Sequence, residues 1–332
     1  MVNKLPFISV IIPAKNEEKL IVNCIDSLNK LDYPKDRYEI IVADGLSTDN
    51  TVLASKEMGA IIVKNEKQTV SPGRNIGFQY SKGELIAFTD ADCIADRNWL
   101  KKSIKYFQQD ETIACVGGPN LTPDDETIFG KGVGFVLDQA IFSAGSIHAR
   151  ELKEIKAVVS IPGCNAIYRR SVLEKVMPLD ETMLTCDDTK LNRAIIDMGF
   201  KLLYTPDVFV WHYRRPTPVK LWKQFYRYAV GRLQVGKKNR KMINLVHICI
   251  GLSFPLLLAF LILLYKYNIY YLSLFLTVIL LCLLYFAIIG MLKWKSFWVG
   301  ASIPFIILLI MAAWSCGFMR ELVFPMKRVE GK

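Results

Sequence analysis

Hydrophobic residues follow one pattern up to about residue 213 and a different pattern after it. In the first part, short apolar runs alternate with segments in which apolar residues recur at helical spacing. The runs lie at 7–12, 38–44, 60–63 and 84–89, and the segments between them at 17–31, 49–58 and 72–81. Short apolar runs predict buried strands, and helical spacing predicts amphipathic helices. Because the two alternate, we expect an α/β domain with a mostly parallel sheet over residues 1–213.

Three long apolar runs follow, at 245–265, 270–292 and 297–319, and none of them contains Asp, Glu, Lys or Arg. At about 1.5 Å per residue, each run is long enough to cross the ~30 Å hydrocarbon core of a bilayer. Three such runs in succession are typical of membrane helices rather than of buried helices in a soluble core. We therefore predict three transmembrane helices in a multi-pass protein of the cell membrane.

The formal net charge is +11, but the charge is distributed unevenly. Residues 1–213 hold 25 basic and 29 acidic residues, whereas 214–241 holds ten basic residues and no acid. A mildly acidic first domain argues against a nucleic-acid partner. The basic stretch predicts an interfacial segment over 214–244 and a cytoplasmic first domain, because positive charges beside membrane helices stay on that side. The basic tail, 320–332, conflicts with three crossings, which would place it outside, unless the last run re-enters the membrane.

The N-terminus has no apolar run long enough for an export signal, and the eight cysteines include no CxxC pair. Scattered cysteines of this kind are typical of a reducing compartment. Their spacing predicts neither a disulfide framework nor a zinc site.

Acidic residues follow three of the predicted strands, within 13–17, 44–49 and 90–92. Ligands of parallel sheets bind beyond the carboxyl ends of the strands, so we expect these residues to line one edge. The edge has neither a GxGxxG motif nor a P-loop to wrap a phosphate in backbone amides. Asp90 and Asp92 stand two residues apart, and a divalent cation between them would suit a diphosphate ligand. A solvated turn is the alternative interpretation of this pair.

The sequence resembles glycosyltransferase family 2, whose members have a nucleotide-sugar-binding type A fold of Rossmann-like α/β architecture. The matching segments are SVIIPAKNEE at 9–18, YEIIVADGLSTDNT at 38–51, SPGRNIGFQYSKGELIAFTDADC at 71–93, PGCNAIYRRSVL at 162–173 and CDDTKLNRAIIDMGF at 186–200. They span nearly all of the first domain in the family's order. The apolar tail is similar to that of members that act in exopolysaccharide or lipid-linked glycan assembly.

The resemblance implies donor contacts at the matching positions Pro13, Ala14, Glu17, Asp44, Arg74, Asp90 and Ala91. It further implies that Asp92 holds Mg²⁺ or Mn²⁺. Asp187 and Asp188 stand where the family usually has Glu-Asp, so Asp188 would be the general base that takes a proton from the acceptor. Asp at 187 is one methylene shorter than the usual Glu. Both acids could instead serve only as the cap of the helix that follows them.

Two further residues of the first domain are candidates. Type A glycosyltransferases often have a late histidine that reaches the metal or the diphosphate, and His212 would fill this place; a histidine without a ligand is an equal alternative. Asn165 follows a Gly-Cys pair and could border the sugar pocket, although a plain turn would also explain it.

The basic segment 222–232, WKQFYRYAVGR, predicts an interfacial helix. Its residues Gln224, Arg227 and Arg232 could contact a lipid phosphate or the donor diphosphate, and simple headgroup anchoring is the slightly favoured alternative. The segment resembles the QxxRW motif of processive synthases but does not match it, so we do not predict a polymerase. The apolar stretch 132–150 could flank an acceptor site, whereas a core helix is the more common explanation.

These features together predict a metal-dependent, inverting glycosyltransferase at the cytoplasmic membrane face. The donor would be a nucleoside-diphosphate sugar, and the acceptor a lipid-linked or growing glycan. A nearby alternative is a synthase that transfers the sugar to polyprenyl phosphate itself. A non-catalytic nucleotide-sugar binder is a further alternative, while charge-free membrane runs argue against a transporter.

Overall fold

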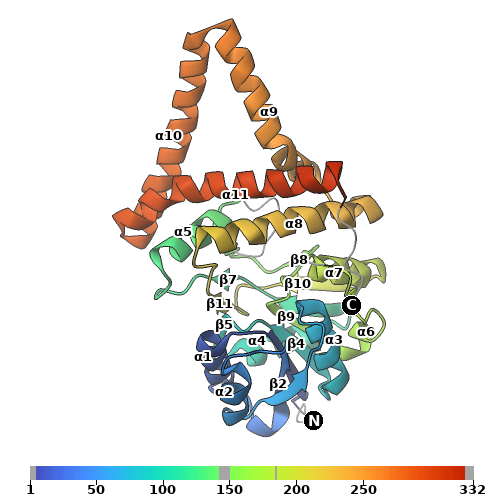
Figure 1. The fold of residues 1–332 in the computed structure, drawn as a ribbon. Coiled ribbons are helices and arrows are strands. Elements are labelled where there is room, and N and C mark those ends of the chain that lie inside the picture. The colour runs from blue at the N-terminus through green and yellow to red at the C-terminus, as the bar shows by residue number, and fades with distance from the viewer. Residues whose placement is uncertain (1–4, 142–149, 184, 326–332) are drawn as a thin grey trace. The chain divides into compact units, whose positions relative to one another are not determined.

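The computed structural model describes residues 5–141, 150–183 and 185–325, which form two compact units (Figure 1). The first unit contains the described residues up to 121 and from 150 to 213, and the second contains 122–141 and 214–325. The chain passes from the first unit to the second for the last time between residues 213 and 214, among the described residues. The first unit differs from the continuous stretch 1–213 expected from the sequence, because residues 122–141 pack with the membrane-type helices.

An eight-stranded sheet forms the centre of the first unit, in the order β3-β2-β1-β4-β9-β6-β10-β8. Its strands are β1 Ile8–Ala14, β2 Tyr38–Asp44, β3 Ile61–Lys64, β4 Leu85–Thr89, β6 Ile113–Gly117, β8 Lys156–Val158, β9 Asn165–Arg169 and β10 Lys201–Tyr204. The first four of these strands in chain order pair in parallel, as do β6 and β10, whereas β9 runs antiparallel to β4 and β6. The predicted mostly parallel sheet is thereby confirmed.

Both faces of this sheet are covered by helices, which explains why its strands are continuous apolar runs. The helices are α1 Glu18–Asn29, η1 Lys35–Arg37, α2 Thr51–Glu57, α3 Val70–Tyr80, α4 Trp99–Gln109, α6 Arg170–Leu173 and α7 Asp187–Asp197. In β1, Val10 and Ile12 belong to the core beneath α1, whereas Ile11 belongs to the opposite core. Successive strand side chains point to opposite faces, so one apolar run serves two cores.

A second, three-stranded sheet brings a late segment of the chain beside an early one. It consists of β5 Cys93–Ala95, β7 Asn120–Leu121 and β11 Val210–His212, with β11 in the centre. In the antiparallel pairing of β11 with β5, His212 lies opposite Cys93. This register places His212 next to the residues that follow β4.

The second unit is helical. It contains α5 Ile128–Asp138, α8 Pro218–Lys238, η2 Arg240–Met242, α9 Leu245–Tyr267, α10 Ile269–Trp294 and α11 Phe297–Val323. The last three helices are long and apolar enough to cross a membrane, and each starts at or next to the residue where a transmembrane helix was predicted. The Thr217 side chain caps α8, and Pro218 occupies its first turn, where proline is favoured.

The three apolar helices differ in how they pack. The α9–α10 pair forms a hairpin, whereas α11 runs beside α8 (Figure 1). In the most apolar stretch of α11, 44% of the residues are buried, against 6% in α9 and 0% in α10. A Cβ on Gly317 would come within 2.3 Å of the Tyr226 carbonyl oxygen, so glycine allows α11 to approach α8 closely. The third predicted span is therefore partly a protein-packed helix.

Candidate active site

The edge formed by the carboxyl ends of β1, β2 and β4 carries most of the predicted donor contacts. Ala14 and Asp44 are register partners at the ends of β1 and β2. Asp44 is 6% exposed, and both of its carboxylate oxygens accept from Ser47 N at 3.2 Å. Pro13 is the last but one residue of β1, and a Cβ on Gly73 would lie 3.0 Å from its Cβ. Glycine thus lets α3 start close to the edge.

Several loop residues of the first unit hold unusual backbone conformations. Asn16, Leu46, Gln68 and Cys186 are non-glycine residues with φ values of 55°, 59°, 61° and 67°. Left-handed conformations in such residues cost free energy and cluster at functional sites. Asn16 Oδ1 accepts from Thr48 N at 2.8 Å, which ties the loop after β1 to the loop after β2. Glu17 ends the first of these loops at the start of α1.

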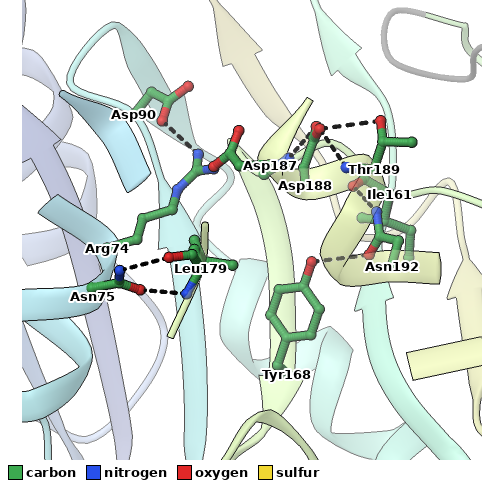
Figure 2. A network of polar contacts seen from close by, with 11 residues as sticks. Arg74, Asn75, Asp90, Ile161, Tyr168, Leu179, Asp187, Asp188, Thr189 and Asn192 are labelled. Atoms are coloured by element: carbon green, nitrogen blue, oxygen red, sulfur yellow. Dashed lines mark hydrogen bonds and ion pairs between the residues drawn. The ribbon is translucent and has the colours of Figure 1, made fainter. Parts of the chain in front are cut away.

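A single arginine joins the edge to the helix that carries the predicted base (Figure 2). Arg74 donates from Nη1 to Asp187 Oδ2 at 3.0 Å and from Nη2 to Asp90 Oδ1 at 3.1 Å. Its side chain is 5% exposed and lies over the Phe88 ring at 5.4 Å. A Cβ on Gly163 would be 2.5 Å from Arg74 Nη1, so only glycine leaves room for the guanidinium. The structure thereby brings three predicted residues into one ion-paired cluster.

The charges of this cluster compensate one another. Although burial alone would lower the pKa of Arg74, Asp187 and Asp90 raise it above its usual value. Burial raises the pKa of Asp90 to about 7, with Arg74 opposing the rise and Asp92 adding to it. The Asp90 side chain is 32% exposed against 12% for Asp187. Asp90 is therefore the carboxylate of the pair that is better placed to meet a ligand.

Asp187 and Asp188 form the first turn of α7 rather than its cap. The N-cap residue is Cys186, whose side chain makes no capping bond. The acids therefore do not cap the helix themselves, although negative charge in a first turn is stabilised by the helix dipole. Asp188 Oδ1 accepts from Thr189 N at 2.6 Å and Oδ2 from Gly163 N at 3.4 Å. The two neighbouring acids thus differ, because Asp187 faces Arg74 and Asp188 faces backbone amides.

Buried asparagine side chains that were not predicted from the sequence hold α3 and α7 in place. Asn192 of α7 accepts from Tyr168 Oη at 3.1 Å and donates to the Ile161 carbonyl at 2.7 Å (Figure 2). Asn75 of α3 exchanges two hydrogen bonds with the Leu179 backbone, at 3.0 and 2.7 Å. Both asparagines follow a predicted site residue along the same helix, but no motif marks them as supports.

The predicted metal residues also lie together. His212 Nε2 is 3.2 Å from Asp92 Oδ1, and Tyr213 N donates to the Asp92 carbonyl at 3.0 Å. Burial alone would lower the pKa of His212, but the Asp92 carboxylate raises it to about 10. Adjacent ligands of an octahedral cation bound at ~2.1 Å stand roughly 3 Å apart, so this pair fits two neighbouring coordination positions. The carboxylate oxygen of Asp92 is a ligand that suits Mg²⁺ or Mn²⁺.

Asn165 has a different role from the predicted one. Its side chain is fully buried, accepts from Trp99 Nε1 at 2.8 Å, and donates to the carbonyls of Pro119 and Val208. The amide is thus occupied by protein groups, and it braces β9. We correct the predicted sugar contact to a structural role.

Gln224, Arg227 and Arg232 lie on α8 in the second unit. Gln224 Nε2 donates to Tyr228 Oη at 3.2 Å, and Arg232 Nη1 donates to the Met242 carbonyl at 3.2 Å. The predicted contacts of these side chains with a lipid phosphate or diphosphate stay predictions. Much of 132–150 also falls outside the described residues, and the rest belongs to α5 and the residues after it.

Comparison with known proteins finds a matching family. A family model described as glycosyl transferase family 2 matches residues 9–177. The chain is 28% identical to glycosyltransferase AglE of Haloferax volcanii over 250 residues, which cover 72% of this chain and 77% of the relative. It is 29% identical to a Methanococcus voltae dolichyl N-acetyl-α-D-glucosaminyl phosphate 3-β-D-2,3-diacetamido-2,3-dideoxy-β-D-glucuronosyltransferase, covering 68% of this chain and 73% of the relative.

A solved structure extends the likeness to the fold. The mannosyltransferase PcManGT from Pyrobaculum calidifontis, in complex with GDP-Man and Mn²⁺, superposes with a TM-score of 0.66 at 19% identity. The match covers 94% of this chain and 88% of that one. It confirms the type A architecture predicted from the sequence.

Proposed function

We propose, since this chain belongs to glycosyltransferase family 2, that it transfers a sugar from a nucleoside-diphosphate donor to a lipid-linked acceptor by direct, inverting displacement. The chain is a glycosyltransferase with three candidate membrane helices. The observation that carries the proposal is the ion-paired cluster in which Arg74 joins Asp90, at the donor edge, to Asp187, beside the base.

We assign the base to Asp188 for a geometric reason. Its neighbour Asp187 is ion-paired with Arg74, while Asp188 accepts from backbone N–H groups in the first turn of a helix, where negative charge is favoured. A carboxylate in this position takes the proton of the acceptor hydroxyl as the new glycosidic bond forms. Among the described residues of the site, Asp187 and Asp90 are ion-paired with Arg74 and Asp92 lies beside His212, so one base remains, which supports single displacement and hence inversion.

The donor would lie along the edge formed by β1, β2 and β4. Buried Asp44 at the end of β2 is placed for the ribose or base, and the partly exposed Asp90 for the ribose and diphosphate side. Asp92 and His212 would hold the Mg²⁺ or Mn²⁺. This cation, when bound, neutralises charge on the departing diphosphate. The PcManGT structure holds Mn²⁺ together with a nucleotide sugar, which supports a divalent cation in this role.

A lipid-linked acceptor is supported by the relatives and by the apolar helices. The Methanococcus voltae relative is named for transfer to a dolichyl-phosphate-linked sugar. The three apolar helices would keep this chain at the bilayer, where such acceptors are found. Free polyprenyl phosphate is the alternative acceptor, and presenting both lipids to one preparation separates the two.

We further propose that α9 and α10 cross the membrane while α11 lies along its surface with α8. Burial of nearly half of the apolar stretch of α11 supports this arrangement. Two crossings would return the chain to the side of the basic residues 214–241, which removes the conflict over the basic tail. Tags at the two termini, probed in sealed vesicles, should be accessible from the same side. Accessibility from opposite sides would support three crossings instead.

The decisive experiment measures sugar transfer by the purified full chain. A panel of nucleoside-diphosphate sugars with Mn²⁺ should yield one that is transferred to a lipid-linked acceptor. Asp92→Asn and Asp188→Asn should each lower the rate of transfer at least ~100-fold, whereas Asp26→Asn, at a solvated position on α1, should leave it unchanged. Full transfer by both site variants would exclude the proposed chemistry. Detection of the product anomer tests inversion separately.

A further inference from the structure

A second group of metal-binding side chains lies beside Asp92. Cys93, Cys164 and His212 place one ligand atom each within 4.8 Å of the others. The two cysteines are 1% and 7% exposed. Among the described residues, this is the group of three side chains whose ligand atoms come close enough to share an ion.

The fold explains how distant residues meet here. Cys93 begins β5 and lies opposite His212 in the β5–β11 pairing. Cys164 directly precedes β9, where Asn120 Nδ2 donates to its Sγ at 3.0 Å. Cys164 also interacts with both Cys93 and His212. Two members of the group thus lie in the three-stranded sheet, and the third lies in the turn that leads into β9 of the large sheet.

The chemistry of this group differs from that of the Asp92 side. Two thiolates and one imidazole are ligands for zinc, with Zn–S near 2.3 Å and Zn–N near 2.0 Å. Ligand atoms of a tetrahedral zinc then stand roughly 3.3–3.8 Å apart, which is compatible with three atoms that lie within 4.8 Å of one another. Carboxylates and water, by contrast, suit Mg²⁺ and Mn²⁺. Sequence spacing did not predict the group, because the three ligands come from separate segments.

We propose that Cys93, Cys164 and His212 form a site for a thiophilic divalent cation of the zinc or cadmium kind. A water or a carboxylate oxygen of Asp92 completes the four-coordinate shell. Binding releases the thiol protons and the imidazolium proton to solvent. Because the His212 ring can serve only one ligand set at a time, a thiophilic cation there displaces the activating cation. This consequence, unlike the binding itself, rests on the proposed function.

Binding is tested first, without any activity measurement. The purified full chain, freed of metal, is titrated with Cd²⁺, and thiolate-to-cadmium absorbance in the ultraviolet is recorded. Cys93→Ser and Cys164→Ser remove one thiolate each with little change in volume. Cys115→Ser is the matched control, since Cys115 is also fully buried but lies in β6 within the opposite core. Thermal unfolding of each variant verifies that it is folded.

The wild-type chain and Cys115→Ser should bind one equivalent of Cd²⁺ with the thiolate signal. Losing even an outer-shell partner of a metal site weakens binding ~10–100-fold, so losing a ligand in the other two variants should weaken it by at least as much. Equal binding by all four proteins, or no thiolate signal in the wild type, would overturn the site.

The inhibitory consequence is tested separately with Zn²⁺ added to Mn²⁺-dependent transfer. Inhibition of the wild type that is relieved in Cys93→Ser supports sharing of His212. Cadmium binding without zinc inhibition would refute the sharing but keep the site. Absence of transfer under every condition would count against the proposed function alone, because the titration does not depend on it.

Discussion

The two units both bury an ion pair, but they bury opposite members of it. In the first unit Arg74 is 5% exposed and its partner Asp90 is 32% exposed. In the second unit the acid is buried: Glu321 of α11 is 3% exposed, while Lys237 of α8 is 41% exposed. An ion pair whose arginine is buried and whose carboxylate is accessible is suited to receive a ligand. An ion pair whose carboxylate is buried and whose lysine is exposed to solvent instead holds one helix against another.

This difference follows from what each pair connects. Arg74 lies between two carboxylates from different segments, so removing either acid leaves the guanidinium a partner. The Glu321 carboxylate accepts hydrogen bonds from Lys237 Nζ at 3.1 Å and from Gln234 Nε2 at 3.3 Å, and both donors belong to α8. The Arg74 cluster distributes charge around a site, whereas the Glu321 contacts stabilise the packing of α11 against α8. If this comparison is right, variants at the edge of the sheet should alter activity more than stability. Variants in the second unit should alter stability more than activity.

The largest expected effect is at Asp188. Asp188→Asn removes the proton acceptor but keeps a side chain of the same size, so transfer should fall about 10²–10⁴-fold, the usual contribution of a general base. The melting temperature should change little, because the amide oxygen of asparagine can still accept from Thr189 N, and only the long 3.4 Å contact with Gly163 N is lost. Initial rates and thermal unfolding of the same preparation check both halves. A large loss of stability with normal rates would reverse the comparison.

Arg74 should give the next largest effect, and it should affect both properties. Arg74→Met leaves Asp187 buried without its cation, at a cost of about 2–3 kcal/mol, below the ~3–5 typical of a fully buried pair because Asp90 meets solvent. Transfer should also fall, since Asp187 and Asp90 lose their common partner. Denaturant unfolding and initial rates measure the two losses, and a loss confined to stability would contradict the placement of Arg74 at the site.

Arg74→Lys is the informative companion variant. It keeps the charge but cannot reach both carboxylates with a planar fork. Stability, measured by the same unfolding experiment, should recover more than activity does. Equal recovery of both would mean that Arg74 contributes charge alone.

The sequence predicted the members of this site but not their connections. Asp44, Asp90 and Asp92 are recognisable because each closely follows or ends an apolar strand, which is a local pattern. The bridge from Arg74 to Asp187 joins residues from separate segments and requires the missing side chain of Gly163. Likewise, the sequence could not show that the N-cap of α7 is the residue before these acids, since that depends on one backbone angle. Local patterns thus predict strand ends, while long-range packing decides which charges meet.

Glu321 should give a smaller effect, on stability only. Glu321→Gln removes the charge that faces Lys237, and because Lys237 can turn to solvent the cost should be about 1–2 kcal/mol. The melting temperature in detergent should fall while the rate per folded molecule stays the same. Glu57→Gln, at an exposed position in α2, is the matched control and should leave both unchanged. A loss of activity larger than the loss of folded protein would show that the second unit also affects catalysis at the edge of the sheet.

The smallest expected effect distinguishes α11 from the α9–α10 hairpin. The sequence alone could not distinguish them, because hydropathy depends on composition and not on which residues pack nearby. Ile306 of α11 is 0% exposed and Ile288 of α10 is 52% exposed. Ile306→Val removes a methyl group from a packed core and should cost about 0.5–1.5 kcal/mol. Ile288→Val removes the same group from a surface that detergent covers, so its melting temperature should match the wild type. Equal shifts would mean that α11 is covered by lipid to the same degree as α10, and would favour three crossings.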